Sequence, residues 1–351
     1  MTEMVDWKLA VATAGQLAGG GPKVSYVEAA GVVAELRRAT DQAETHVMDF
    51  THLRPAVEHP PVRVVDRADW ADINVAGFRT LLTPVVEKLQ RRTGSQPGPI
   101  ATAVGSRVTG VQVGSILAFL AGKVLGQYEV FSGAPGQLLL VAPNIVAAER
   151  ALGVDPGDFR LWVCLHEVTH RTQFTAVPWL RDHFLAEVSA FVDAADPDEM
   201  KERLLTAVAQ IARAIRERDT QLSIIDLVQT PAQKAVLDRL TALMTLVEGH
   251  AEFVMNGVGP MVVPSVETIH AKFQARRGGT GPLDRALRRL LGIDVKMRQY
   301  AEGSKFVTAV VRQVGMDGFN RVWDSPAALP TMAEVAAPAT WVARVHESTT
   351  G

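Results

Sequence analysis

The sequence predicts a mainly α-helical protein with a small β element. Three observations support this fold class. Apolar residues recur at the three- and four-residue spacing of amphipathic helices over most of the 351 residues. Side chains that commonly cap helix N-termini precede two of these segments. One short run is instead continuously apolar and bounded by turn residues, which is typical of a buried strand.

The composition is that of a soluble globular protein. Hydrophobic residues make up 47% of the chain and charged residues 21%, which argues against disorder. A formal net charge of -2 gives no global field for nucleic acid or anionic lipid, so we expect no nucleic-acid partner. Cys164 is the single cysteine, which excludes a disulfide within the chain. With no export signal recognised near residue 1, we expect a cytoplasmic protein.

The predicted helices follow the apolar periodicity in chain order. Ser25 and Glu28 have the spacing of a capping box at the start of the first long helix, which runs to residue 50. Asp155–Pro156 is a good start for a helix that runs through residue 174. A long helix from Pro231 is expected to end at Gly257. Further helices are predicted over residues 69–92, 115–131, 200–219, 282–292 and 294–315.

Two strongly apolar segments are interpreted separately. The predicted strand is QLLLVAPN, residues 137–144. Pro143 cannot donate to a neighbouring strand, so an edge position or a strand end is expected rather than a central strand. Residues 108–128 are interrupted by Lys123 and fall short of the roughly 20 apolar residues of a membrane span. We therefore predict a buried helix there and no membrane span.

The segment LWVCLHEVTHRTQF, residues 161–174, carries the clearest chemical signal. His166 and His170 lie one turn apart on one helix face, so both imidazoles can reach one tetrahedral cation at about 2.0–2.1 Å. Glu167 lies beside the first histidine and can contact a water on the metal without ligating the metal. This is the H-E-x-x-H pattern, in which the glutamate is the general base.

The same short pattern also arises by chance in helices. A metal site and an ordinary helix with two histidines are therefore both open at this point. The apolar flank, residues 161–165, predicts a buried helix, and two buried imidazoles need polar partners. A catalytic zinc also needs a third protein ligand.

A resemblance suggests that ligand. The segment TLVEGHAEFVMN, residues 245–256, is similar to the second ligand helix of the gluzincin metallopeptidases. The resemblance implies that Glu248 is the third zinc ligand. Glu252 shares its helix face and matches the carboxylate that orients the first zinc histidine in thermolysin-like gluzincins, so its implied partner is His166. The sequence departs from these families in the long linker between His170 and Glu248, and in a Val where the aminopeptidase branch has Asn before the ligand.

More of the chain resembles one family. The segments VVDRADWADINVAGF, LGQYEVF, LHEVTHRTQF, VEGHAEFVM and KMRQYAEGSKFVTAVV, with FNRVWDSPAALPT, together resemble an actinobacterial family of zincin-like proteins over residues 5–335. Its members are described as zinc-dependent metallopeptidases or hydrolases, and some carry a label for deazaflavin-coenzyme biosynthesis. The resemblance implies a zincin-like helical fold with a small β element beside the active-site helix, and Zn²⁺ as cofactor.

The resemblance also implies a chemistry. We expect a zinc-dependent hydrolase, most simply a metallopeptidase, with Glu167 as the base. A later side chain would steady the oxyanion: Tyr300 is the candidate, and His250 and His270 are its rivals. His250 points to a different face of its helix than Glu248, so a structural role is favoured for it. In zincins an edge strand binds extended substrate, and residues 137–142 are the candidate strand or, equally, a core strand.

Two other functions remain open. One is an amidase or deacylase that uses the same site on a small amide substrate. The other is a metal-stabilised scaffold without turnover, against which the retained Glu167 argues. We predict a single zincin-like domain over residues 1–351, with an N-terminal helical portion over 1–135 and a catalytic portion over 136–335. The oligomeric state is left open.

Three further features are interpreted as structural. His46, Asp49 and His52 can share a helix face, but solvent-facing polar groups are favoured over a second metal site. Cys164 is interpreted as a small buried hydrophobe turned away from the metal-binding face. The basic segment Ala271–Arg298 is interpreted as a solvated helix face, because the aromatic residues that would stack on bases are sparse there.

Overall fold

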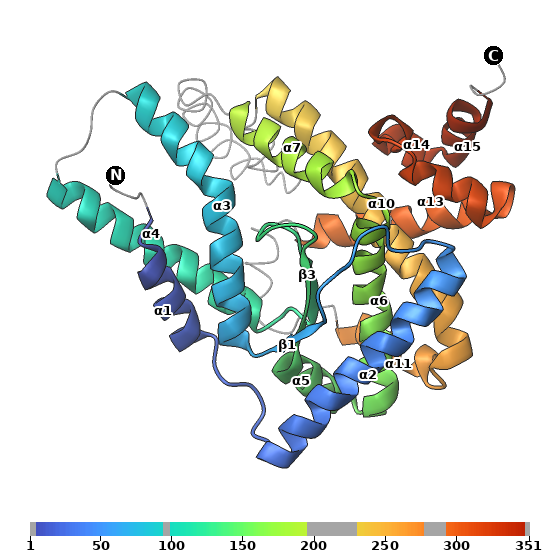
Figure 1. Ribbon diagram of the computed structural model, residues 1–351, viewed down its shortest axis with the longest axis horizontal. Coiled ribbons are helices and arrows are strands. Elements are labelled where there is room, and N and C mark those ends of the chain that lie inside the picture. Colours follow the sequence, from blue (N-terminus) through green and yellow to red (C-terminus); the bar gives the residue numbers. More distant parts are fainter. Residues whose placement is uncertain (1–4, 94–98, 195–229, 277–292, 348–351) are drawn as a thin grey trace, which may run out of the picture.

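The computed structural model describes residues 5–93, 99–194, 230–276 and 293–347. Long helices surround one small sheet (Figure 1), which confirms the mainly α-helical prediction. The predicted helices at 200–219 and 282–292 lie outside the described residues.

The helices are numbered along the chain. The N-terminal part contributes α1 (Trp7–Leu17), α2 (Tyr26–Thr51), α3 (Arg67–Thr93) and α4 (Pro99–Ala121). The middle part contributes α5 (Ala142–Leu152), α6 (Pro156–Ala176) and α7 (Leu180–Asp193). The C-terminal part contributes α10 (Pro231–Val262), α11 (Val266–Arg276), α13 (Ile293–Asn320), α14 (Met332–Ala336) and α15 (Pro338–Val342).

The sheet contains β1 (Arg63–Val65), β2 (Gly126–Glu129) and β3 (Gln137–Val141) in the order β1-β3-β2. The strand β3 is central, parallel to β1 and antiparallel to β2. The predicted edge position for this strand is therefore wrong, whereas the alternative, a strand that ends at the proline, is confirmed. Pro143 does not interfere, because the strand ends before it and the proline lies in the first turn of α5, where a missing N–H costs little.

The predicted helix over 115–131 is also wrong in its second half. The helix α4 ends at Ala121, and the chain then forms β2. The pairing with β3 begins where the Val141 N–H donates to the Leu125 carbonyl at 2.8 Å. Pairing with a strand distant in sequence overrides the local helical pattern. As a result β2, rather than β3, is the edge strand on this side of the described sheet.

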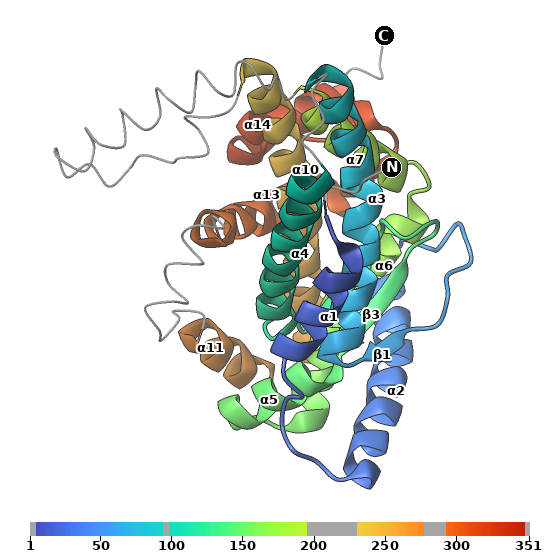
Figure 2. The same ribbon diagram turned by 90° about the vertical axis from the view of Figure 1, so that its left-hand side faces the viewer.

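The two faces of β3 join two hydrophobic cores. Leu138 and Leu140 pack with α2 and α6, while Leu139 and Val141 pack with α1, α3 and α4. Figures 1 and 2 show these two groups of helices on either side of the sheet. A third core lies between α10, α13 and the C-terminal helices and includes Trp341. Each large side chain buried in this way contributes about 1.5–3 kcal/mol.

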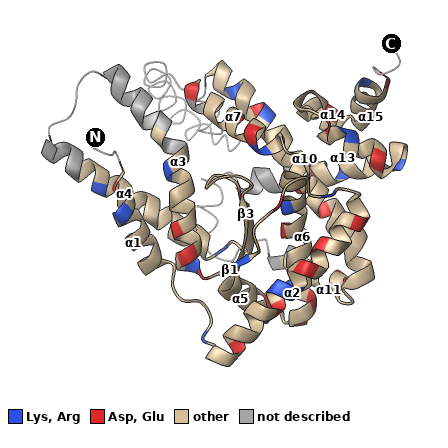
Figure 3. Ribbon diagram, in the orientation of Figure 1, with Lys and Arg blue, Asp and Glu red and all other residues tan. Residues whose placement is uncertain are grey.

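The helix α4 is more exposed than predicted. Only 28% of its residues 104–121 are buried, so the prediction of a buried helix is wrong. Gly110 and Gly114 allow the close approach of α1, because a Cβ on either would lie 2.5 Å from a backbone oxygen. The helix carries the exposed valines Val104, Val108 and Val111, and Figure 3 shows few charged residues along its described part. Within the described ranges, it is the one helix long and apolar enough, by length and composition, to cross a membrane.

The helix α10 continues past Gly257 to Val262, so the predicted C-terminus is wrong. Gly257 serves a different purpose. A Cβ at this position would lie 2.1 Å from the Phe50 ring, so glycine permits α2 to pack closely on α10.

The start of α6 is as predicted. The Asp155 carboxylate accepts a hydrogen bond from the Asp158 N–H at 2.9 Å, and Pro156 occupies the first turn. The helix extends through Ala176 and crosses the interior between α2 and α10 (Figure 1). The predicted boundary between residues 135 and 136 falls between β2 and β3, two strands of the same sheet, and the division into portions stays a prediction.

Candidate metal centre

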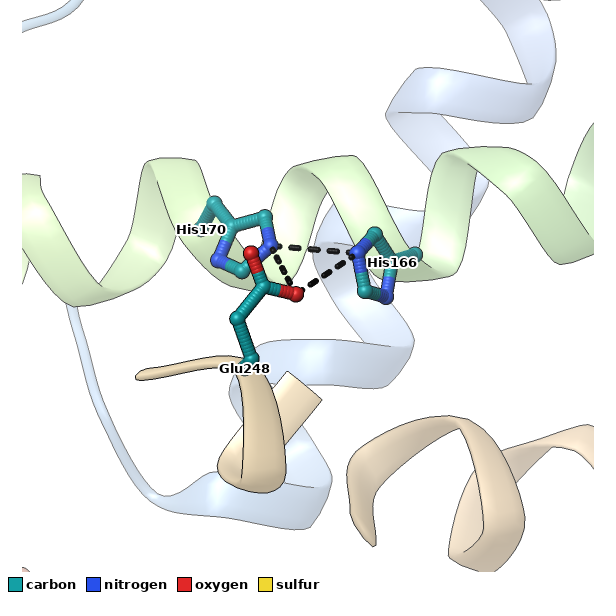
Figure 4. Close-up of side chains that lie close together, drawn as sticks. All are labelled: His166, His170 and Glu248. Carbon is teal, nitrogen blue, oxygen red and sulfur yellow. Dashed lines mark hydrogen bonds and ion pairs between the residues drawn. The ribbon is translucent and has the colours of Figure 1, made fainter. Parts of the chain in front are cut away.

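Three side chains of the types that ligate metals meet between α6 and α10. His166 and His170 lie on α6, and Glu248 reaches them from α10 (Figure 4). The two Nε2 atoms are 3.1 Å apart, and Glu248 Oε2 lies 3.6 Å from His166 Nε2 and 3.7 Å from His170 Nε2. The two helices, which the sequence motif alone could not connect, therefore present three ligand atoms to one point.

Gln173 determines the protonation pattern of His170. Its Oε1 accepts a hydrogen bond from His170 Nδ1 at 3.0 Å, and its Nε2 donates to the Val247 carbonyl and to His250 Nδ1, each at 2.9 Å. The Val247 carbonyl can only accept a hydrogen bond, so the amide of Gln173 is oriented with its nitrogen toward Val247 and its oxygen toward His170. The proton of His170 is then on Nδ1, and its Nε2 presents a lone pair to the cluster.

His166 has the same arrangement through a different partner. Its Nδ1 lies 3.1 Å from the Met255 thioether sulfur, which accepts hydrogen bonds weakly and has no proton to donate. This contact favours a proton on Nδ1 and a lone pair on Nε2. Both imidazoles thus point lone pairs at each other and at a carboxylate oxygen.

This arrangement fits zinc. Three converging acceptors without a proton between them repel one another, and a cation relieves that repulsion. A triangle with the observed sides has a centre about 2.0 Å from each corner, which matches Zn–N and Zn–O bond lengths. Two histidines and one glutamate are also a ligand set of catalytic zinc sites, in which the fourth position stays open to water or substrate.

Glu167 lies beside the cluster and is buried at 7% exposure. Burial, followed by the nearby charge of Glu248, raises the pKa of its carboxyl to about 8. Its side chain lies against the backbone of Gly126, where a Cβ would come within 2.6 Å of Glu167 Cδ. The edge strand β2 and the predicted base are therefore in direct contact.

Two cavities open from the cluster, and both are lined by His166, Glu167 and Glu248. We name them by one aromatic wall residue each. The Trp162 cavity has a volume of about 210 Å³, and its apolar wall is Leu125, Trp162, Val163, Met255 and Phe273. The Phe184 cavity has a volume of about 280 Å³, and its apolar wall is Val130, Phe131, Phe174, Phe184, Met244 and Val247.

The other predicted site residues have different surroundings. Glu252 and His270 line the Trp162 cavity, Glu252 together with its implied partner His166. His250 is fully buried and stacks on Phe319, in agreement with its structural interpretation. Tyr300 belongs to the helix α13, but its side chain lies outside the described residues.

The features interpreted as structural are arranged as follows. His52 pairs with Asp317 at 2.7 Å, and Asp49 pairs with Arg54 at 3.0 Å, so these two side chains do not share a ligand position. Cys164 is fully buried, and burial raises the pKa of its thiol to about 12. Most of the basic segment 271–298 lies outside the described residues.

Sequence reasoning missed Gln173, Met255 and Gly126. Gln173 follows His170 by three positions and thus shares the ligand face of α6, which is a signal that helical periodicity could have revealed. Met255 and Gly126 carry no such signal, because their contacts with His166 and Glu167 depend on how α10 and β2 pack against α6.

Comparisons with known proteins agree with this geometry. The chain matches the profile of the zincin-like metallopeptidase family over residues 5–342. It is also similar to the crystal structure of "a putative hydrolase with a novel fold" from Chloroflexus aurantiacus, with 30% sequence identity and a TM-score of 0.70. That match covers 99% of this chain and 100% of the other. No curated protein matches significantly.

Proposed function

Because this chain belongs to the zincin-like metallopeptidase family, we propose that it is a zinc-dependent hydrolase, most simply a metallopeptidase that cleaves peptide bonds. The observation that carries the proposal is the convergence of three lone-pair donors beside a buried glutamate. The proposed ligands are His166, His170 and Glu248, which is the gluzincin-type set. Glu167 is the proposed general base.

The chemistry divides between the metal and the chain. When bound, zinc supplies Lewis acidity, which lowers the pKa of a water to about 7 and polarises a substrate carbonyl. Glu167 adjoins His166 and lines both cavities, so it can accept the proton of the attacking water. It then returns that proton to the leaving amine. Burial keeps bulk water from competing for this proton.

Two further residues have proposed roles. Glu252, in the cavity beside His166, is proposed to orient that imidazole or the substrate. Tyr300 is proposed to steady the oxyanion. Its backbone precedes Gly303 by three positions, about one helical turn, and Gly303 packs backbone to backbone against Gly249, the neighbour of Glu248. This crossing brings the relevant part of α13 near the ligand helix.

The outer edge of β2 is proposed to bind extended substrate. The hydrogen bond from Val141 N–H to Leu125 O sets the alternation of the antiparallel pair. By this alternation, the backbone N–H and C=O groups of Gly126 and Tyr128 point away from β3. Both residues line the Phe184 cavity, so a substrate backbone could pair with them beside the metal.

An amidase or deacylase that acts on a small metabolite is the second candidate. The size of the Trp162 cavity, about 210 Å³, favours it, because that volume holds one small substituent. The same ligands and the same base would serve. The two candidates differ in whether peptides are cleaved by the zinc-loaded protein.

The first test is metal content, measured by plasma mass spectrometry. We expect about one zinc per chain in the wild type and a sharp loss in His166→Ala and Glu248→Ala. Glu167→Gln should retain zinc and lose activity. His46→Ala is the matched control, since this histidine lies outside the cluster, and its zinc content should equal that of the wild type. Absence of zinc from the wild type after reconstitution would refute the proposal.

A further inference from the structure

We propose that the exposed side of α4 binds an anionic lipid surface, with the helix lying in the plane of the membrane rather than crossing it. Four exposed apolar side chains form this side, and we call them the α4 stripe: Val104, Val108, Val111 and Ile116. The inference goes beyond the proposed hydrolase activity and does not depend on it, because the α4 stripe lies outside both cavities of the metal site.

The helix α4 carries apolar residues on all sides, yet only one side is covered. Gly110 and Gly114 allow close backbone contact with α1 on the buried side. On the outward side, the members of the α4 stripe are 43–58% exposed. A helix that is apolar all round is normally buried in a protein core or in lipid. Figure 2 shows α4 on the side of the molecule that faces the viewer, so its outward side is open to a partner.

The hydroxyl groups near the α4 stripe can enter an apolar environment at little cost. The Thr109 hydroxyl donates to the Gly105 carbonyl at 3.0 Å, and the Ser115 hydroxyl donates to the Val111 carbonyl at 2.8 Å. Both donors are thus satisfied within the helix and stay satisfied when water is removed. Gln112 adds one neutral amide, which the polar headgroup region of a bilayer can accommodate.

The charges of α4 favour anionic lipid. Arg107 near the start of the α4 stripe and Lys123 beyond its end are both exposed, and residues 99–123 contain no acidic residue. The Lys123 ammonium lies 5.5 Å from the centre of the Phe119 ring, so the ring can face the apolar layer while the ammonium reaches a headgroup. The formal net charge of -2 supplies no attraction from the whole protein, so these local charges select the surface.

A lipid surface fits the α4 stripe better than a second copy of the chain does. From Val104 to Ile116 the helix rises about 18 Å and is about 10 Å wide, so the stripe offers roughly 200 Å². A stable protein interface buries about 800 Å² on each partner. Pairing of α4 with the same helix of a second copy would also bring basic residues together without an acidic residue on α4 to balance them. A lipid surface has no minimum area of this kind and supplies the opposite charge.

The packing of α1 keeps α4 at the membrane surface. The backbone oxygens of Asp6 and Ala10 would lie 2.5 Å from a Cβ on Gly110 and Gly114, respectively, so the two helices are in backbone contact. To cross the membrane, α4 would have to lose this contact or carry the exposed Lys8 of α1 into the hydrocarbon. Binding in the plane of the membrane buries the outward side alone and leaves α1 in place.

The first experiment is co-sedimentation of the full chain with vesicles of phosphatidylcholine, alone or mixed with phosphatidylserine. We expect stronger binding to the mixed vesicles, which falls about fivefold in Lys123→Gln and about tenfold or more in Val108→Glu. Val27→Glu is the matched control, because Val27 is 79% exposed on α2, and it should bind like the wild type. Equal binding to both kinds of vesicle, no binding to either, or unchanged binding of Val108→Glu would overturn the proposal.

The second experiment locates the contact and tests the alternative occupant. Cys164 is the single cysteine and is fully buried, so a cysteine introduced by Val108→Cys can be labelled alone with an environment-sensitive fluorophore. With mixed vesicles we expect its fluorescence to rise and to be quenched by lipids that carry a quencher on the acyl chain, whereas the same label in Val27→Cys should show neither effect. Thermal unfolding confirms that each variant is folded. A wild-type dimer in sedimentation velocity that Val108→Glu dissociates would identify a second copy as the occupant and overturn the proposal.

Discussion

His170 and His250, on different helices, are joined through the single amide of Gln173, whose oxygen accepts from His170 Nδ1 at 3.0 Å while its nitrogen donates to His250 Nδ1 at 2.9 Å. All three side chains are almost wholly buried. The amide nitrogen also donates a hydrogen bond to the carbonyl of Val247, the residue before Glu248. One side chain therefore sets the tautomer of a histidine on α6 and ties it to the helix that carries Glu248.

We predict that Gln173→Leu weakens zinc binding by about 10–100-fold. Leucine has a similar volume, but it can neither accept a hydrogen bond from His170 Nδ1 nor donate one to the Val247 carbonyl, so His170 loses the constraint on its tautomer. Competition with a chromogenic chelator measures the affinity. Gln112→Leu, on the exposed face of α4, is the matched control. In cobalt-substituted protein, the exchangeable Nδ1–H signal of His170 should also be lost. An unchanged affinity and an unchanged signal would show that Gln173 only fills space.

Gly126→Ala should reduce activity by about 10²–10⁴-fold while the zinc content stays at the wild-type level. The new Cβ would lie 2.6 Å from Glu167 Cδ and would displace the buried base without touching a ligand. Activity and metal content are measured on the same sample. Gly122→Ala is the control, because its nearest neighbour would be at an ordinary 3.6 Å. Equal activities in the two variants would contradict the contact between β2 and the base.

Gly303→Ala should destabilise the fold by about 1–3 kcal/mol or more and weaken zinc binding as well. A Cβ at this position would lie 2.0 Å from the Thr245 carbonyl oxygen, and backbone atoms cannot move aside as a side-chain tip can. Thermal unfolding measures the effect. Gly31→Ala, with no atom within 4 Å in the exposed part of α2, should instead raise stability by about 0.5–1 kcal/mol. If Gly303→Ala and Gly31→Ala changed the stability to the same extent, the α10–α13 contact would be contradicted.

Because the hydroxyl of Tyr128 is buried, we predict that the protein loses stability at alkaline pH. Burial, partly offset by the charges of Arg171 and Arg181, raises the pKa of its hydroxyl to about 12 from 10.0. Between these values the unfolded chain has released the proton and the folded chain retains it, so stability falls as the pH rises. The full contribution, present below pH 10, is about 3 kcal/mol. Between pH 9 and pH 11, denaturant unfolding should show about half of this loss, about 1.4 kcal/mol, in the wild type but not in Tyr128→Phe.

The sequence by itself determined the parts of the site that depend on local geometry. The spacing of His166 and His170 gives one shared helix face at any position in the fold, because it follows from the period of the helix. The Asp155–Pro156 start of α6 depends likewise on neighbouring residues. The resemblance singled out Glu248, but no local rule could bring it within reach of α6.

The tertiary structure decided what depends on packing between distant segments. Residues 126–129, which were predicted to be helical, pair with β3 and form the edge strand beside Glu167. The same pairing places β3 at the centre of the sheet. Gly257 lies inside α10 rather than at its end, and its missing Cβ leaves room for the Phe50 ring of α2. The meeting of Glu248 with the two histidines, and the amide of Gln173 that orients one of them, arise only when α6 and α10 pack together. Helical periods and caps act over a few residues, whereas the strand edges and helix crossings that complete this site depend on contacts between residues far apart in the chain.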